Sequence, residues 1–449
     1  MTVVVPDLRP AGTFTVPRTA ERTLANGLTV LAIQRCAVPL VELRLRVPFG
    51  AATLSPSYLA SSALLSQTLF SGTSIMSTVD IAAQLQSLGG ALGAGVDPDR
   101  LLVSGNALAS GLDRMLAILA EVLTDASYPE DEVTTERERL AEHIQIAESQ
   151  PAHVVRVALL RRRYGDHPYS VQTPTVPQVH AVTPAVLRAL HADRIHPAGA
   201  QLVLVGDVEA ERALDAAEQA LAGWDGPGTD DAVPPVPQPR LGPVTLVDRP
   251  GSVQSSLRMT LAAVERRHPH HAALQLANLI FGGYFSSRWV ENIRENKGYT
   301  YSPHSYVEHS QAGSSLVLST DVATEVTGPA LLETVYELGR IATSPPREQE
   351  LEQARQYALG TLQLGMSTQA GLANLASTYA SFGLRLEYLV EHAARLGAAT
   401  VDDVAAAAAR YLAPARALTV VLGDADRMEA ALTTLAAVER TTVDEVLAA

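Results

Sequence analysis

The chain has 449 residues, a length that suggests at least two domains. Its formal net charge of −14 argues against nucleic acid or an anionic membrane as the main partner, since both need a basic surface. Cys36 is the only cysteine, which excludes an intramolecular disulfide and a thiolate metal cluster. The N-terminus lacks a signal-peptide pattern, so we expect a cytoplasmic protein.

The predicted elements begin after an extended N-terminal arm (1–20). The patterns then predict strands at 28–33 and 41–47, helices at 58–70 and 79–88, a strand at 100–106, helices at 112–123, 132–149 and 184–192, and a strand at 201–205. The glycine-rich run 89–95 has neither dinucleotide-binding nor phosphate-loop spacing. Strands mixed with helix pairs in this order indicate a sheet covered by helices.

A Pro/Gly-rich linker (225–243) follows, and the landmarks beyond it repeat those before it. The pairs that lie 217 positions apart are Gly111 and Gly328, Pro129 and Pro346, Thr183 and Thr400, Pro197 and Pro414, and Gly206-Asp207 and Gly423-Asp424. Chance seldom keeps one register over so long a span. We therefore predict an α+β fold made of two tandem halves, 21–224 and 244–449.

The stretch Phe281–Ser302 contains the most informative local pattern of the second half. Two glycines open a loop, a short amphipathic helix follows, and Gly298 ends that helix. The alternating residues 299–301 then predict a strand. This arrangement places Arg294, in the last helical turn, beside Tyr301 on one surface. On composition alone, a solvated arginine and a packed tyrosine would be the simpler interpretation.

This stretch closely resembles the second-domain signature of the insulinase/pitrilysin family of zinc peptidases. That signature is a glycine loop, a helix ending in Ile-Arg-Glu, and Gly-x-x-Tyr-Ser. In that family an arginine and a tyrosine hold the substrate carbonyl, so the resemblance implies that Arg294 and Tyr301 bind substrate. Two donors aimed at an oxygen that gains charge provide oxyanion-type stabilisation. The resemblance also implies two halves with mainly antiparallel sheets that face each other as a clamshell.

Active members of the family carry His-x-x-Glu-His on a helix of the first half, with a third ligand further along the chain. The tail 68–73 fixes the register of that motif here. Ala63 then stands at the first histidine, Ser66 at the general-base glutamate, Gln67 at the second histidine and His143 at the distal ligand. Neutral side chains of this kind cannot assemble a zinc site.

Other histidines do not restore a metal site. No register slip helps, since 47–79 contains no Asp, Glu, His, Lys, Arg or Cys. His143 fits better as an ordinary helix histidine. The run His268–His271 resembles a metal motif but is predicted as an exposed turn at a helix start, and one ion rarely takes all its ligands from one tetrapeptide. His304 and His309 fall on opposite faces of a strand.

These features predict the non-catalytic, substrate-binding subunit of a bacterial-type heterodimeric zinc metallopeptidase that degrades or processes peptides. The resemblance implies a chain that is inactive alone and essential in the complex, where Arg294 and Tyr301 serve the zinc site of a His-x-x-Glu-His partner subunit. The zinc cofactor is expected in that partner and not in this chain. Two alternatives stay open: a structural homologue like the core proteins of the cytochrome bc1 complex, and an independent peptide-binding module.

Overall fold

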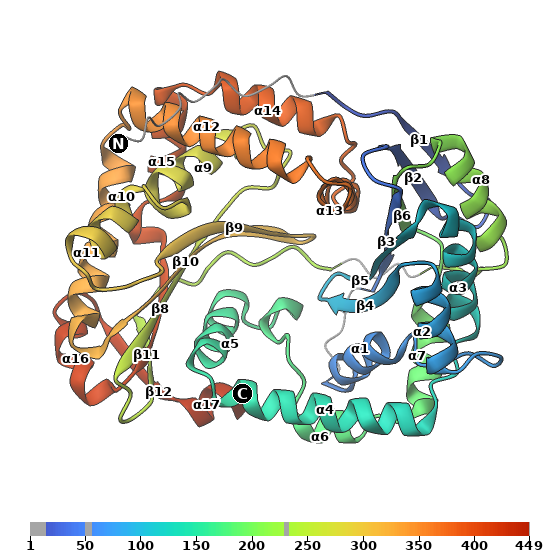
Figure 1. Ribbon diagram of the computed structural model, residues 1–449. Coiled ribbons are helices and arrows are strands. Elements are labelled where there is room, and N and C mark those ends of the chain that lie inside the picture. The colour runs from blue at the N-terminus through green and yellow to red at the C-terminus, as the bar shows by residue number, and fades with distance from the viewer. Residues whose placement is uncertain (1–14, 50–55, 229–232, 449) are drawn as a thin grey trace, which may run out of the picture.

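The computed structural model describes residues 15–49, 56–228 and 233–448, so most of the predicted arm (1–20) and four residues of the predicted linker lie outside the described residues. Within these ranges the chain forms two six-stranded sheets, one from each half, with helices packed on them (Figure 1). The predicted α+β fold of two similar halves is therefore confirmed.

The elements have the following bounds. The first sheet contains β1 (Thr19–Thr23), β2 (Thr29–Gln34), β3 (Leu40–Pro48), β4 (Ala91–Asp97), β5 (Arg100–Leu108) and β6 (Gln201–Gly206). The second contains β7 (Val244–Asp248), β8 (Gln254–Ala262), β9 (His304–Ser310), β10 (Gly313–Ala323), β11 (Leu418–Gly423) and β12 (Val438–Thr442). The first half has helices α1 (Pro56–Thr68), α2 (Thr78–Ser87), α3 (Leu112–Asp125), α4 (Glu130–Ser149), α5 (Pro151–Tyr164), α6 (Val176–His180), α7 (Pro184–Arg194) and α8 (Ala210–Leu221). The second half has α9 (His271–Asn278), α10 (Arg288–Val290), α11 (Thr327–Thr343), α12 (Glu348–Gly365), α13 (Gln369–Ser381), α14 (Tyr388–Ala398), α15 (Val401–Tyr411), α16 (Ala425–Thr433) and α17 (Val443–Ala448). Two stretches of π-helix, η3 (Leu279–Gly283) and η4 (Glu291–Asn296), and the short 3-10 turns η1 (Ala109–Gly111), η2 (Pro168–Ser170), η5 (Thr324–Val326) and η6 (Pro414–Arg416) complete the set.

The two halves share the strand order that a tandem duplication requires. The first sheet runs β1-β2-β6-β3-β5-β4 and the second β12-β7-β11-β8-β10-β9. Five neighbouring strands correspond, and only the outermost strand differs, since β1 pairs antiparallel with β2 whereas β12 pairs parallel with β7. Helices α7 and α15, and strands β6 and β11, begin and end 217 positions apart. The sequence register of the repeat is thus also the structural register.

Several elements of the first half were not predicted from the sequence. The glycine-rich run 89–95 overlaps β4, which pairs with β5 at the edge of the sheet. Its residues alternate between exposed and half-buried along its whole length. Strand β1 begins at Thr19, inside the predicted arm, and the buried stripe of α8 (Ala213, Leu214, Ala217 and Leu221) packs against the first core.

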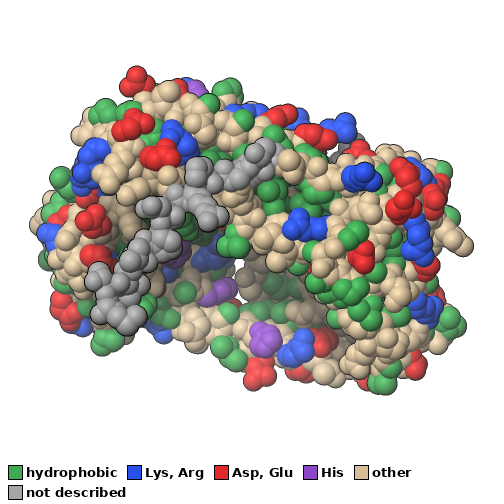
Figure 2. All heavy atoms as spheres, turned by 45° about the horizontal axis from the view of Figure 1, so that its top comes forward, with side chains coloured by type: hydrophobic (Ala, Val, Ile, Leu, Met, Phe, Trp, Pro, Cys, Tyr) green, Lys and Arg blue, Asp and Glu red, His purple; other side chains and the backbone are tan. Residues whose placement is uncertain are grey.

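The halves are joined by a reciprocal exchange of helices. Helix α5 leaves the first half and packs on β8 and β11 of the second sheet, whereas α13 leaves the second half and packs on β3 and β6 of the first (Figure 1). Buried valines of α5 (Val154, Val155) join a cluster with Val420 of β11. Leu372 of α13 likewise joins Val203 of β6. The space-filling view shows a hollow between the two lobes (Figure 2).

Gln369 is a polar anchor of this exchange. The side chain of Gln369 is buried at the start of α13, and its Nε2 lies 3.0, 3.1 and 2.9 Å from the backbone carbonyls of Arg35, Val38 and Leu40. Arg35 and Val38 lie in the turn between β2 and β3, and Leu40 is the first residue of β3. One amide group therefore attaches the crossing helix to the other half.

We predict that Gln369→Ala destabilises the whole chain, because three backbone carbonyls of this partly buried contact lose their donor. The expected loss is about 2 kcal/mol in the free energy of unfolding, measured by urea denaturation. Gln356→Ala on α12 is the matched control, since Gln356 is exposed and its side chain, among the described residues, bonds only to Glu352 one turn away. Equal stability of the two variants would contradict an anchoring role.

Candidate functional site

Arg294 lies on a short helix that changes from α10 to the π-helix η4. The wider turn is visible in the backbone, where the amide of Lys297 donates to the carbonyl of Asn292 at 3.0 Å. Gly298 ends the helix with a φ of +66°, and its amide donates to the carbonyl of Arg294 at 3.0 Å. The predicted helix stop is therefore correct. Stretches of π-helix are rare and are frequent at functional sites.

Polar contacts hold this helix against α11. The indole Nε1 of Trp289 donates to Thr334 Oγ1 at 3.0 Å, and both side chains are buried. The amide of Asn292 lies 2.9 Å from both Glu333 and Glu337. One buried indole and one doubly bonded amide therefore fix the face of the helix that points away from Arg294.

A buried ion pair attaches the same helix to α12. Arg288 Nε and Nη2 lie 2.7 and 2.9 Å from the two carboxylate oxygens of Glu350, a bidentate geometry. The backbone amide of Arg347 also donates to Glu350 at 2.8 Å. Burial alone would raise the pKa of Glu350, but these hydrogen bonds outweigh it and lower that pKa to about 2. The pair is charged throughout the physiological range.

The guanidinium of Arg294 lies over two aromatic rings. Its central carbon lies 4.3 Å from the ring centroid of Phe285 and 4.9 Å from that of Tyr301. Nε faces Glu295 at 3.3 Å. Within the described residues, Nη1 and Nη2 donate to no acceptor, and neither does the hydroxyl of Tyr301, a residue that is 81% exposed. These donors are free to meet an external acceptor.

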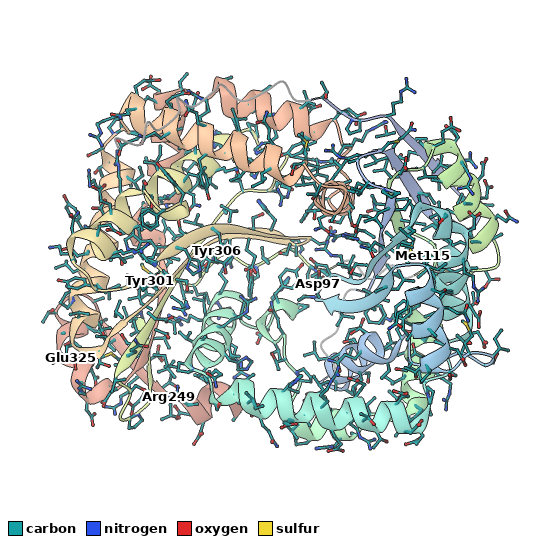
Figure 3. The ribbon with its side chains drawn as sticks, in the orientation of Figure 1. Asp97, Met115, Arg249, Tyr301, Tyr306 and Glu325 are labelled. Atoms are coloured by element: carbon teal, nitrogen blue, oxygen red, sulfur yellow. The ribbon has the colours of Figure 1, made fainter. Side chains whose placement is uncertain are left out.

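The structure brings Arg294 and Tyr301 together, as the pattern predicts, but by a different local structure. Residues 299–301 do not form the predicted strand, since β9 begins only at His304. The hydroxyl of Thr300 instead donates to the backbone carbonyl of Asp321 at 2.7 Å and holds the loop against β10. Figure 3 shows Tyr301 beside the β9–β10 hairpin, with Tyr306 further along it.

Helix α1 carries the positions that match the zinc motif, and its side chains do not fit a metal. Ala63 is half-buried, Ser66 is buried and donates to the carbonyl of Ala63 at 2.9 Å, and Gln67 is exposed. His143 is exposed on α4, which packs against α1. Among the described residues, no group of three or more His, Cys, Asp or Glu side chains is arranged to hold a metal ion. In the same ranges no helix is long and apolar enough to cross a membrane.

His271 corrects the prediction of an exposed turn at 268–271. The turn exists, but His271 opens α9 and is buried between two other histidines, with ring centroids 5.2 Å from His309 and 4.8 Å from His392. Burial lowers the pKa of His271 to about 2, of His309 to about 3 and of His392 to about 4, and the charge of Arg266 acts in the same direction. The three rings are neutral at physiological pH.

Comparisons with known proteins agree with this geometry. A family profile described as Insulinase (Peptidase family M16) matches residues 29–174, and one described as Peptidase M16 inactive domain matches residues 181–357. The chain belongs to the insulinase family. The second match contains both Arg294 and Tyr301, and the first contains the motif positions on α1.

Relatives and solved structures span most of the chain. An uncharacterized zinc protease of Mycobacterium bovis is 25% identical over 92% of this chain and 94% of its own length, and one of Streptomyces coelicolor is 23% identical over 91% and 90%. The match to one from Mycobacterium leprae spans 65% of that protein. An M16 inactive domain from Pseudomonas fluorescens has the same fold, with a TM-score of 0.81 at 24% identity over 90% of this chain and 98% of its own. A protease from Helicobacter pylori gives 0.83 at 18% identity, over 91% and 100%.

We predict that Arg288→Met destabilises the chain by about 3 kcal/mol, because Glu350 is left charged and buried without its main partner. Replacing both residues, Arg288→Met with Glu350→Leu, should recover part of that loss, since it removes the unpaired charge. Urea denaturation of both variants tests this. A double variant no more stable than the single one would show that the ion pair is not the cause.

The buried histidines predict a specific dependence of stability on pH. The unfolded chain takes up protons on them near pH 6.5, whereas the folded chain does so only at lower pH. The free energy of unfolding should therefore be undiminished above about pH 6.5 and fall below it, by up to about 1.4 kcal/mol per pH unit for each histidine. His392→Gln should reduce that slope between pH 6 and 5, whereas His143→Gln, on an exposed residue, should not. Identical slopes would contradict the assignment.

Proposed function

We propose that the chain is the non-catalytic, substrate-binding subunit of a heterodimeric zinc peptidase of the cytoplasm. Its partner would be a homologous subunit with the His-x-x-Glu-His motif, and this chain would supply Arg294 and Tyr301 to the partner's site. One observation carries the proposal: the chain keeps two adjacent side chains with unused donors, while α1 offers no ligand or general base at Ala63, Ser66 and Gln67.

The chemistry of the pair suits a peptide carbonyl. Contacts with the rings of Phe285 and Tyr301 restrict the guanidinium of Arg294. The remaining N–H groups and the Tyr301 hydroxyl can then donate to one oxygen. Fixed donors gain most when the oxygen becomes anionic, as it does during peptide hydrolysis. Zinc, held by the partner, would supply the activated water, and this chain would bind and polarise the carbonyl.

Strand β4 supports a peptide as the ligand. It is an edge strand, so the backbone groups on one side of it are not used by the sheet. Its exposed positions include Gly93 and Gly95, and a Cβ added at either glycine would meet nothing within 4 Å. An extended peptide can add to such an edge through main-chain hydrogen bonds.

We predict that Tyr301→Phe slows the reconstituted pair without preventing its assembly. The substitution removes only the hydroxyl, so kcat should fall on the order of 10²-fold, with the affinity of the subunits and the zinc content unchanged. Arg294→Ala should behave alike, and the double variant should fall short of additivity because both donors serve one oxygen. The assay uses a quenched peptide and the chain mixed with a His-x-x-Glu-His homologue from the same genome.

Tyr336→Phe is the control, because Tyr336 is 57% exposed on α11 and has no part in the stack around Arg294. Full turnover of both Tyr301→Phe and Arg294→Ala would reject the proposed role and favour the structural alternative. Peptide cleavage by this chain alone would reject it as well.

A further inference from the structure

Phe285 is a large apolar side chain exposed beside Arg294. One face of its ring lies against the guanidinium of Arg294, 4.3 Å from centroid to the central carbon. The residue is nevertheless 59% exposed, so the ring keeps a second surface open to solvent. Exposed aromatic surface next to free hydrogen-bond donors is typical of binding sites.

The loop that presents Phe285 is fixed rather than free to retract. A Cβ on Gly282 would lie 2.8 Å from the indole of Trp289 and 2.9 Å from Ser305 Oγ, so the backbone is pressed against the core. Phe281, just before it, is buried and stacks on Trp289 at 5.4 Å. The loop therefore buries the ring of Phe281 and holds the ring of Phe285 outside the core.

The apolar surface continues from Phe285 towards α12. Tyr284 stacks on Tyr357 with ring centroids 5.1 Å apart, and Tyr357 is 45% exposed. A cavity of about 450 Å³ opens beside Tyr284 and Phe285, between this loop and the start of α12. It is large enough for an amino-acid side chain.

The charges around this cavity largely cancel. Glu350 is paired with Arg288 and Arg347, and Glu295 with Arg294. Only the carboxylate of Glu291 has no partner among the described residues that line the cavity. Aromatic rings and paired ions together favour an apolar side chain over a strongly charged one.

We propose that Phe285 and Tyr284, the two aromatic residues that line this cavity, form a side-chain subsite that takes an aromatic or long aliphatic residue of the bound peptide. The subsite lies next to the carbonyl position served by Arg294 and Tyr301, and the inference rests on the proposed function of that pair. Phe285 is then a specificity-determining residue: its ring restricts Arg294 with one face and packs on the substrate with the other.

Binding of labelled peptides to the purified full chain tests the subsite directly. Two fluorescein-labelled peptides of Ala, Ser and Gln are compared by anisotropy, one with a single central phenylalanine and one with alanine there. Because the peptide has a single aromatic residue, that residue alone determines how the peptide aligns with the subsite. The wild-type chain should bind the phenylalanine peptide roughly tenfold more tightly, the ratio expected for burying most of one aromatic side chain.

Phe285→Ala should reduce this ratio to about one, whereas Phe285→Tyr should retain it. Tyr336→Ala, an aromatic residue of similar exposure on α11, should also leave it unchanged. An unchanged ratio in Phe285→Ala, or no saturable binding of either peptide to the wild-type chain, would overturn the subsite. Loss of selectivity in Phe285→Ala together with full turnover of Tyr301→Phe in the pair would instead leave the subsite standing and reject the role of Tyr301.

Discussion

The structure depends on the exchange of α5 and α13 between the halves. A sheet with helices on one face still has apolar residues on the other face. Hydrogen bonds between strands do not bury these residues, so another element must pack on them. The inner face of each sheet receives that cover from the opposite half, through valines of α5 on β11 and leucine and alanine of α13 on β6. Neither half therefore completes its core alone, and the duplication has become one interlocked unit.

The exchange also decides which surfaces stay open. Helix α5 packs on β8 and β11, whereas His304 and Tyr306 on the edge strand β9, which β10 separates from β8, remain exposed. The loop with Tyr301 enters this uncovered edge, and the π-helix with Arg294 lies behind it. Most surface ion pairs contribute little to such an arrangement, but the bidentate Arg288–Glu350 pair is largely removed from water. This ion pair attaches the helix that carries Arg294 to α12.

Sequence patterns predicted the parts of this arrangement that local rules govern. The offset of 217 positions identified the duplication, and Gly298 identified the end of the helix, since a left-handed residue is a local requirement. The burial of His271 escaped prediction because its neighbours His309 and His392 come from distant elements. The strand expected at 299–301 failed because the hydroxyl of Thr300 takes a backbone acceptor of β10, a contact that alternation alone does not reveal.

The helix exchange and the π-helix were also not predicted, because both depend on contacts between residues that are distant in the sequence. The apolar stripes of α5 and α13 predict burial but not the sheet that buries them. The sequence of η4 fits an ordinary α-helix, and its wider turn depends on Trp289 and Asn292 meeting Thr334 and Glu337 of α11. Phe285 gave no signal of its own, because exposure beside a stacked guanidinium is a property of the folded loop.

The requirements of folding explain the side chains at the zinc-motif positions of α1, but they do not explain Arg294 and Tyr301. At the zinc-motif positions of α1, Ala63 and Ser66 are small and Ser66 bonds within its own helix, which suits a packed element. Tyr301, by contrast, is 81% exposed and buries little apolar surface. The stack with Arg294 is worth about 0.5–1 kcal/mol at an exposed site. That contribution requires neither the phenolic hydroxyl nor two unused guanidinium nitrogens, so the fold alone does not account for these donors, which supports the proposed role of the pair.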